Sequence, residues 1–416
     1  MIIFKLAWRN LWRNSKRSWI SIFAISTAFL ILMVMSGILE GMSVQMLKNG
    51  TELFQGHIQI HHQDYLPGRN MYDWIGGMES YNLEHLMEEV VSVAGVQASA
   101  PRVYGFGLIS TGENTTAANL SGMDPAREPS VTRLLKSSIE GENLSPGPRR
   151  EILAGKILAK TLGVSPGDEV AIVTQSADGT TGNDLYTVSG LIATGLTALD
   201  RSLVIMHWRD LQELLAVEEW QVHEVALLVN NPQESDIIAD RLTDLPALPP
   251  DTLAESWEDL LPMLKEYIEV ARTSGWILIL FVGIFAGFGT LNTMMMSVFE
   301  RTREIGTVNA LGMSPGKILT MFLLESFFLS ILGLGIGFAG GLLIISYLTR
   351  NGLDLSAWVV DMSFAGSHID PVMQVVWTWD EFLTSALCLT AVVLMATLLP
   401  ALRAARMKPV DALAKV

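Results

Sequence analysis

The stretch WILILFVGIFAGFGTLNTMMMSV, residues Trp276–Val298, decides the fold class of this 416-residue chain. It carries no charged side chain and is longer than the roughly 20 helical residues that cross a hydrocarbon core of about 30 Å. Three further stretches are also apolar and long enough to span: Trp19–Leu39, Ile318–Leu348 and Phe382–Leu402. The sequence therefore predicts an α-helical membrane protein with four transmembrane helices.

The composition supports a membrane protein and argues against redox chemistry. Hydrophobic residues make up 50% of the chain and charged residues 17%, whereas a soluble domain has about 25% charged residues. The lone cysteine, Cys388, falls in the fourth apolar stretch, so we expect neither a disulfide framework nor a cysteine-based metal site. The first stretch is longer than the roughly 7–15 apolar residues of a signal peptide, so we expect it to remain as an anchor.

Basic residues predict which loops face the cytoplasm. The first 17 residues carry five basic and no acidic side chains, and the short loop after the second span is also basic. Residues 349–381 carry one basic side chain against five acidic ones. By the positive-inside rule both chain ends and the loop 300–317 are cytoplasmic, and the large segment 43–272 lies outside.

The external segment 43–272 carries 15 Lys and Arg against 33 Asp and Glu, a net charge of −18. This charge argues against nucleic acid as a partner, and indicates either an ordinary solvated surface or a site for a cationic partner. Hydrophobic patterns predict strands at Gly56–His62, Asp168–Gln175 and Leu185–Gly195, and an amphipathic helix at His207–Val217. We therefore expect a large α+β domain inserted between the first and second spans.

Two more helices are predicted in this segment. Glu151–Val164 has the pattern of a short helix closed by Gly163. Ala254–Gly275 has the pattern of an amphipathic helix that runs into the second span, with a kink at Pro262.

Three histidines, His57, His61 and His62, raise the question of a metal site. Such a site needs three or four converging ligands with supporting partners. We expect these histidines to lie on a strand surface instead, and we predict no metal site.

The N-terminal residues are predicted to form an amphipathic helix on the cytoplasmic leaflet. Phe4, Trp8, Leu11 and Trp12 fall on one side of a helical projection, beside an arc of basic residues. The expected organisation is 1–17 interfacial helix, 18–42 first span, 43–272 external domain, 273–299 second span, 300–317 cytoplasmic coupling helix, 318–348 third span, 349–381 external loop, 382–402 fourth span and 403–416 cytoplasmic tail.

Glycines at helical spacing predict close packing of the spans. Gly333, Gly337 and Gly341 recur every four residues in the third span, and Gly283 and Gly287 do so in the second. Such spacing lets helix backbones approach closely in lipid. Packing within one chain and a seam between two copies are both compatible with it.

The cytoplasmic loop ERTREIGTVNALGMSPGKI, Glu300–Ile318, carries the most specific signal. Arg301–Leu311 is predicted to form a short polar helix closed by Gly312. Ser314 and Pro315 then begin the next helix as its N-cap and first residue. A stiff helix that projects between two spans is suited to act as a lever for a cytoplasmic partner.

The segment RTREIGTVNALG of this loop is similar to the coupling-helix signature of FtsX-like permeases. LLPALRAARMKPVDALAKV, Leu398–Val416, resembles the C-terminal signature of the same family. The resemblance implies a permease subunit of an ABC transporter of the FtsX/MacB/Lol superfamily in the bacterial inner membrane, with its large domain in the periplasm. It also implies a set of ATPase-coupling residues: Arg301, Arg303, Glu304, Ile305, Gly306, Leu311 and Gly312.

The resemblance implies that ATP is hydrolysed by another chain. MacB proteins carry an ATPase ahead of the first span, and this sequence does not. GMSPGKI at Gly312 is one residue short of a phosphate-binding loop motif and lacks its Ser or Thr. We therefore expect a transport subunit that is not an enzyme and binds no cofactor, assembled with two copies of an ABC ATPase that hold ATP and Mg²⁺, and with a second permease, identical or homologous.

The external domain looks like one branch of the superfamily. Glu151–Ile172 and Tyr186–Leu215 look like the corresponding regions of Lol-type permeases, which extract lipoproteins from the inner membrane and pass them to a periplasmic carrier. The resemblance implies a lipoprotein or lipid-anchored substrate. Two alternatives stay open: a MacB-like exporter or mechanotransmission permease working with a periplasmic adaptor and outer-membrane channel, and a regulator of a cell-wall hydrolase.

Lipid-anchored substrates would need an apolar chamber, since each buried CH₂ group contributes about 0.8 kcal/mol. Its expected walls are the outer halves of the first and second spans: Met33, Leu39, Met42 and Met46 on one, and Ile268, Trp276, Ile279 and Leu280 on the other. The alternative is that these residues face lipid or one another.

Glu325 is an acidic residue within the third span, where insertion of a charge costs roughly 2.5–3.5 kcal/mol. It lies about two helical turns from Lys317 at the cytoplasmic end. We expect a structural or coupling role, and not proton chemistry; a Glu early in the third span is also usual in MacB proteins.

Overall fold

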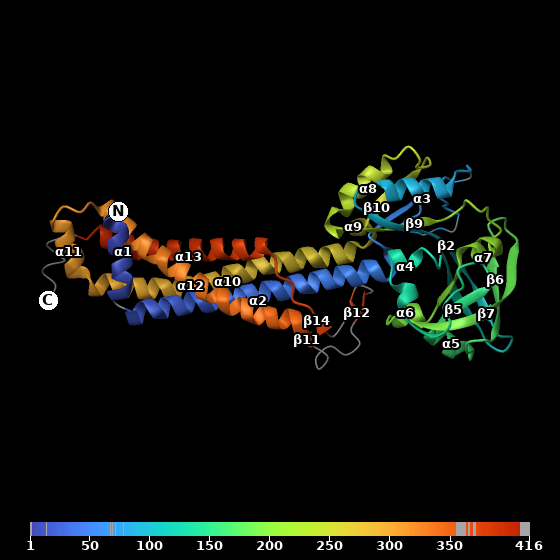
Figure 1. Cartoon of the computed structure of the whole chain (residues 1–416), viewed down its shortest axis with the longest axis horizontal. Helices are drawn as coiled ribbons and strands as arrows, with labels where there is room; N and C mark the ends of the chain where they lie inside the picture. Colours follow the sequence, from blue (N-terminus) through green and yellow to red (C-terminus); the bar gives the residue numbers. More distant parts are fainter. Residues whose placement is uncertain are drawn as a thin grey trace. The chain divides into compact units, whose positions relative to one another are not determined.

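The structure is a computed structural model that describes residues 2–13, 15–66, 68, 70, 72–77, 79–354, 363–364, 367–368 and 372–407. Most of the predicted tail 403–416 and part of the predicted loop 349–381 lie outside these residues. The elements in chain order are α1 Ile2–Arg13, α2 Ser15–Gly50, the π-helical turn η1 Thr51–Gln55, β1 Ile58–His62, α3 Leu83–Ser92, β2 Val96–Ser110, β3 Thr115–Met123, α4 Glu128–Val131, η2 Leu134–Lys136, β4 Ser138–Gly141, β5 Glu151–Gly155, α5 Lys156–Leu162, β6 Glu169–Gln175, β7 Thr181–Ala193, α6 Thr197–Asp200, β8 Leu203–His207, α7 Trp208–Leu214, β9 Glu224–Val229, η3 Pro232–Glu234, α8 Ser235–Thr243, β10 Thr252–Ser256, α9 Trp257–Leu260, α10 Pro262–Glu300, α11 Thr302–Ala310, α12 Pro315–Asn351, β11 Leu353–Asp354, β12 Ser363–Phe364, β13 Ser367–His368, β14 Val372–Met373 and α13 Trp379–Ala405 (Figure 1).

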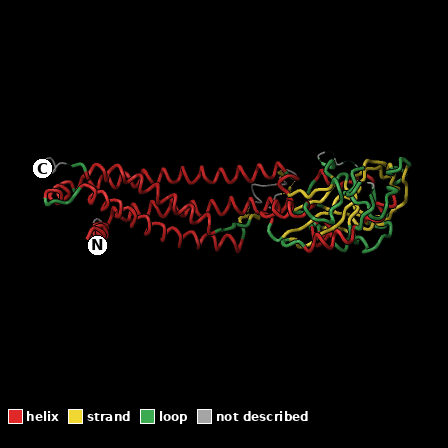
Figure 2. Tube along the Cα trace, turned by 90° about the horizontal axis from the view of Figure 1, so that it is seen from above, coloured by secondary structure: helices red, strands yellow, loops and turns green. Residues whose placement is uncertain are grey.

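The chain forms two compact units, and four long helices make up most of the first. Helices α2, α10, α12 and α13 each contain one of the predicted apolar stretches, and they lie side by side in both views (Figures 1 and 2). Within the described residues, these four helices are long and apolar enough to cross a membrane. The predicted membrane fold with four spans is confirmed.

Each of the five glycines singled out in the sequence faces another helix of the same chain. A Cβ atom on Gly337 of α12 would lie 2.6 Å from the backbone oxygen of Ser26 in α2. Gly333 and Gly341 face α2 in the same way, and Gly283 and Gly287 of α10 face Val392 of α13. The glycines thus allow the helix backbones to approach one another closely.

The second unit, residues 46–266, is built on a mixed ten-stranded sheet. The strand order is β10-β1-β9-β2-β3-β8-β5-β7-β4, with β6 pairing to both β2 and β7. The long strand β2 pairs antiparallel with β9, β3 and β6, while the pairs β3–β8 and β5–β7 are parallel. Because this sheet and its helices lie between α2 and α10 in the chain, the predicted inserted α+β domain is confirmed.

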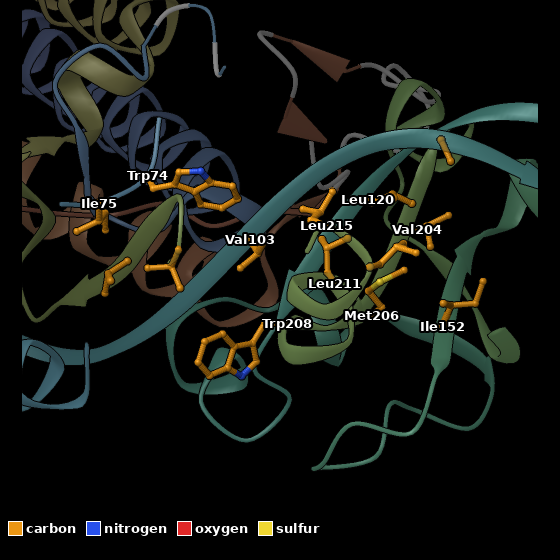
Figure 3. Close-up of a cluster of buried hydrophobic side chains, with 14 of the residues drawn as sticks. Trp74, Ile75, Val103, Leu120, Ile152, Val204, Met206, Trp208, Leu211 and Leu215 are labelled. Carbon is orange, nitrogen blue, oxygen red and sulfur yellow. The ribbon is translucent and has the colours of Figure 1, made fainter. Parts of the chain in front are cut away.

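The sheet unit has its own apolar core. Figure 3 shows side chains of this core, including Trp208 and Leu211 of α7, Val103 of β2 and Leu120 of β3. Full burial of one such aliphatic side chain contributes about 1.5–3 kcal/mol.

Two predicted helices differ from the structure. Glu151–Val164 begins as strand β5, and only Lys156–Leu162 is helical, although Gly163 closes the helix at φ 75° as expected. The prediction for Ala254–Gly275 is wrong at its start, because β10 pairs with β1 there. Pro262 is the first residue of α10 and therefore does not kink the helix interior.

The prediction that His57, His61 and His62 lie on a strand surface is wrong for His57 and His61. Strand β1 lies between β10 and β9, and His57 and His61 are both buried. The ring Nδ1 of His57 lies 3.2 Å from the backbone oxygen of Val229, and burial lowers the pKa of His57. His61 Nε2 lies 3.3 Å from a carboxylate oxygen of Glu255.

A buried charged network lies near the point where the chain enters the domain from α2. Arg102 donates to both carboxylate oxygens of Glu128, at 2.6 and 3.1 Å, and to Glu224 at 2.9 Å. All three side chains are 0% exposed. Gln59 donates to the backbone oxygen of Gln55 in the π-helical turn at 2.9 Å and lies 3.4 Å from Glu224. Burial opposes the charge on Arg102, but the neighbouring carboxylates outweigh it and raise the pKa of Arg102 well above its ordinary value.

Candidate functional site

The short helix α11 is the candidate functional site, and its sequence explains its ends. It lies between α10 and α12 and covers most of the predicted coupling segment. Gly312 adopts φ 96° directly after the helix, a conformation that glycine adopts without strain. Ser314 and Pro315 then begin α12 as its N-cap and first residue, as predicted.

The inner face of α11 is buried against the ends of the long helices. Ile305 belongs to an apolar cluster with Phe322 of α12 and Ala401 of α13. Gly306 is also buried, and Asn309 Nδ2 donates to the backbone oxygen of Met407 at 3.0 Å. This face therefore fixes α11 to the last turns of α13 and the first turns of α12.

Arg301, at the N-terminus of α11, connects three elements. Its Nη2 donates to the backbone oxygen of Asn10 in α1 at 3.0 Å, and its Nη1 lies 3.6 Å from Oε2 of Glu325 in α12. The side chains of Arg301 and Glu325 are 6% and 5% exposed. The carboxylate within the third span is therefore paired with a cation near the start of α12.

Two more ion pairs connect the N-terminal part of the chain to this site. Arg13 of α1 pairs with Glu304 of α11, and Arg17 of α2 pairs with Glu300 at the end of α10. The sequence interpretation did not identify these partners. The sequence offered no signal for them, because Arg13 ends α1, Arg17 lies in α2, and their partners lie in two further helices, α11 and α10.

The outer face of α11 is exposed. Of the predicted coupling residues, Arg303, Glu304, Leu311 and Gly312 lie on it, whereas Arg301, Ile305 and Gly306 lie on the inner face. Leu311 is 83% exposed. The predicted set therefore divides into residues that hold the helix and residues that present a surface of mixed charge with one apolar side chain.

The predicted chamber residues do not form one surface within the chain. Met33 is buried against Gly341 of α12, and Met46 is buried near the C-terminal end of α2. The exposure of the other six varies: Leu39, Met42, Ile268 and Ile279 are half-buried, and Trp276 and Leu280 are exposed. Met33 therefore has a packing role, and the half-buried residues are the better positions at which to look for a substrate.

Two known families match most of the chain. Residues 18–245 match the MacB-like periplasmic core domain, and residues 276–409 match the FtsX-like permease C-terminal family. The first match covers most of the sheet unit and the second covers α11 with the spans on either side of it. Together they include the candidate site and most of the inserted domain.

Individual proteins are similar over different lengths. The lipoprotein-releasing system transmembrane protein LolC of Xylella fastidiosa (strain Temecula1) is 25% identical over 360 residues, which are 83% of this chain and 82% of LolC. The macrolide export ATP-binding/permease protein MacB of Shigella sonnei is 36% identical over 132 residues, 32% of this chain and 18% of MacB. The crystal structure of the periplasmic region of MacB from Actinobacillus actinomycetemcomitans covers 52% of this chain and 95% of its own, with 12% identity and a TM-score of 0.36. The match of the periplasmic core domain to more than half of the sequence, joined to a permease C-terminal region, shows that the chain belongs to the FtsX-like permeases of ABC transporters that carry a MacB-like periplasmic core domain.

Proposed function

We propose that this permease extracts lipoproteins or other lipid-anchored substrates from the bacterial inner membrane, powered by a separate ABC ATPase. The observation that supports this function most is the extent of the similarity to LolC, which covers 83% of this chain and 82% of LolC. It therefore includes both the spans and much of the external domain. We further propose that two permeases, identical or homologous, assemble with two ATPase subunits that bind ATP and Mg²⁺.

The proposed ATPase docking surface is the outer face of α11. Arg303, Glu304 and Leu311 are exposed there, while the inner face is held by buried contacts. A helix fixed on one side and exposed on the other can pass a displacement from a partner to the spans that it contacts. Since α11 connects α10 to α12, such a displacement would reach both helices through the backbone as well as through side chains.

The docking surface can be tested with a charge reversal in the full chain. Arg303→Glu should reduce co-purification of the ATPase and stimulation of ATP hydrolysis about tenfold or more, because a partner charge at an interface would then face a like charge. Lys317→Glu is the matched control, since Lys317 is an exposed basic residue in the first turn of α12, outside α11. If Arg303→Glu assembles and hydrolyses ATP as the control does, the docking assignment is wrong.

A second candidate function is export with a periplasmic adaptor and outer-membrane channel. It is favoured by the higher identity to MacB, 36%, over the 132 residues that match. The two functions differ in where the substrate enters the complex. A lipid-anchored substrate leaves the bilayer past the spans, whereas an exported molecule enters from the periplasm or the membrane and passes to the adaptor.

A photocrosslinker on the first span separates the two functions. At Met42, a half-buried position on α2, it should capture a triacylated lipoprotein before ATP is added and lose it afterwards. At Met33, which is buried against Gly341, it should capture no substrate. Capture of phospholipid alone at Met42, together with co-purification of a periplasmic adaptor, would favour the exporter.

A further inference from the structure

Helix α1 presents three adjacent stripes of different chemistry. Ala7 and Leu11 are buried, and α1 packs on α12. Phe4, Trp8 and Trp12 follow at four-residue spacing beside the buried stripe, and Lys5, Arg9 and Arg13 follow at the same spacing beside the aromatic residues. Residues four apart share one helix face, so the aromatic stripe lies between the packed face and the basic face.

The aromatic stripe is exposed although it touches α12. The rings of Phe4 and Trp8 contact Phe328 edge-on, with centroid distances of 4.8 and 5.3 Å. Phe4 is nevertheless 56% exposed, and Trp8 and Trp12 are each 44% exposed. Tryptophan side chains favour the boundary between headgroups and acyl chains, so this stripe has the chemistry of a surface that lies in the membrane interface.

Two cations of the basic stripe, together with Lys16 at the start of α2, have no acidic partner among the described residues. Lys5, Arg9 and Lys16 are exposed and form no ion pair with any residue that the structure describes. No acidic residue lies in α1 or in the first turn of α2 to compensate them. Cations directly beside interfacial aromatic side chains match the phosphate groups of anionic lipids, whose headgroups lie just above the acyl boundary.

The other side of α1 is connected to the coupling helix. The backbone oxygen of Asn10 accepts a hydrogen bond from Arg301, and Arg13 pairs with Glu304 of α11. Helix α1 therefore contacts α11 through Asn10 and Arg13 near its C-terminal end, and leaves the aromatic stripe, Lys5 and Arg9 to another partner. Whatever holds α1 in place also limits the movement of α11.

We propose that α1, with Lys16 of α2, is a binding surface for anionic phospholipids of the cytoplasmic leaflet, and that lipid bound there stabilises the position of α11. Lipid binding by α1 does not depend on the proposed function. The effect of lipid on α11 rests on the proposed function only in taking α11 as the coupling helix. A second copy of α1 is a poorer occupant, because α1 carries basic and no acidic side chains and would face its own charge.

The lipid preference is measured on the purified full-length permease without ATPase. The chain is equilibrated with equal amounts of phosphatidylglycerol and phosphatidylcholine, and retained lipids are counted by native mass spectrometry. Wild type should retain phosphatidylglycerol in preference, and Lys5→Gln/Arg9→Gln/Lys16→Gln should lower that preference at least tenfold, since each cation contributes roughly fivefold to binding an anionic surface. The control Lys317→Gln/Arg350→Gln/Arg406→Gln removes three exposed cations from other parts of the helical unit and should retain the preference.

The connection to α11 is measured by hydrogen exchange in nanodiscs with and without phosphatidylglycerol. Amides of residues 302–310 should exchange several-fold more slowly with the anionic lipid in wild type and in the control, but not in the Lys5/Arg9/Lys16 variant. If wild type retains both lipids equally, or if the mass spectrum shows association of two copies of the chain and no bound lipid, the proposed lipid-binding surface is wrong. If wild type prefers the anionic lipid but the amides of α11 exchange equally fast with and without it, bound lipid does not stabilise the position of α11. Neither result depends on the ATPase or on substrate, so the proposed function is tested separately.

Discussion

Replacement of Arg102 by methionine should destabilise the sheet unit strongly. Arg102→Met keeps a long flexible side chain but leaves the carboxylates of Glu128 and Glu224 buried without a cation. Loss of one partner from a buried ion pair costs roughly 3–5 kcal/mol. Because 1 kcal/mol shifts the melting temperature by about 2–4 °C in a domain of this size, the sheet unit should melt about 6–20 °C lower.

The matched control is the same substitution at an exposed arginine. Arg127 pairs with Glu84 at 2.8 Å, but its side chain is 39% exposed. Exposed pairs contribute about 0–1 kcal/mol, so Arg127→Met should melt close to wild type. Thermal denaturation of the full chain in detergent gives the overall change, and hydrogen exchange of the β2 amides assigns the change to the sheet unit.

A third variant distinguishes lost charge balance from lost packing. Arg102→Met combined with Glu128→Gln and Glu224→Gln removes all three charges. It should recover part of the stability that Arg102→Met loses, because no uncompensated charge remains buried. If Arg102→Met melts within about 2 °C of Arg127→Met, or if the triple variant recovers nothing, the buried charges do not have the role assigned to them here.

Two further predictions concern the spans and the pH dependence of the domain. Gly337→Ala should destabilise the helical unit by about 1–3 kcal/mol in a detergent melt, since the new Cβ would lie 2.6 Å from a backbone oxygen of α2. Gly335→Ala is the control: its Cβ would have no atom within 4 Å, so it should be neutral or slightly stabilising in the same melt. If the two variants change the stability of the helical unit equally, the close packing of α12 on α2 at Gly337 is wrong. Burial lowers the pKa of His57, so the unfolded chain takes up a proton at a pH at which the folded domain stays neutral, and stability should fall as the pH drops below about 6.5. His57→Phe should lose less stability between pH 7.5 and pH 5.5 than wild type does, and an equal loss would contradict this account.

The spans and helix α11 could be predicted because their signals are local. An apolar stretch such as Trp276–Val298 needs no tertiary contact to identify it as a span. The ends of α11 and α12 follow from Gly312, Ser314 and Pro315, whose backbone preferences act on their own positions. These are the parts of the fold that sequence pattern and local backbone chemistry determine.

The buried polar residues of the sheet unit could not be predicted in this way. The alternation in Gly56–His62 indicates which residues share a face, but not whether that face is covered. His57 and His61 are buried because β1 pairs with β9 and β10, strands that follow more than 150 residues later in the chain. In the sequence Arg102 is likewise indistinguishable from an exposed arginine, since its partners come from α4 and β9.

The ion pair of Glu325 could be predicted only in part. The expectation of a structural or coupling role rested on its distance from the cytoplasmic end of the span. That distance does not identify Arg301, because the pairing requires the chain to reverse through α11 so that the start of α12 lies beside the end of α10. A cationic partner could be expected from the cost of an uncompensated charge in lipid, but its identity required the structure.

Two of the Arg–Glu pairs around α11 differ in what their loss would cost, and this difference suits them to different tasks. Arg13–Glu304 is half-exposed on both sides, so its net contribution is about 0–1 kcal/mol and it can break or exchange partners easily. Arg301–Glu325 is nearly fully buried, and loss of either partner would leave a charge stranded at a cost of roughly 3–5 kcal/mol. A partner that displaces α11 would therefore release the outer pair first, while the inner pair and the apolar cluster around Ile305 keep α11 attached to the spans.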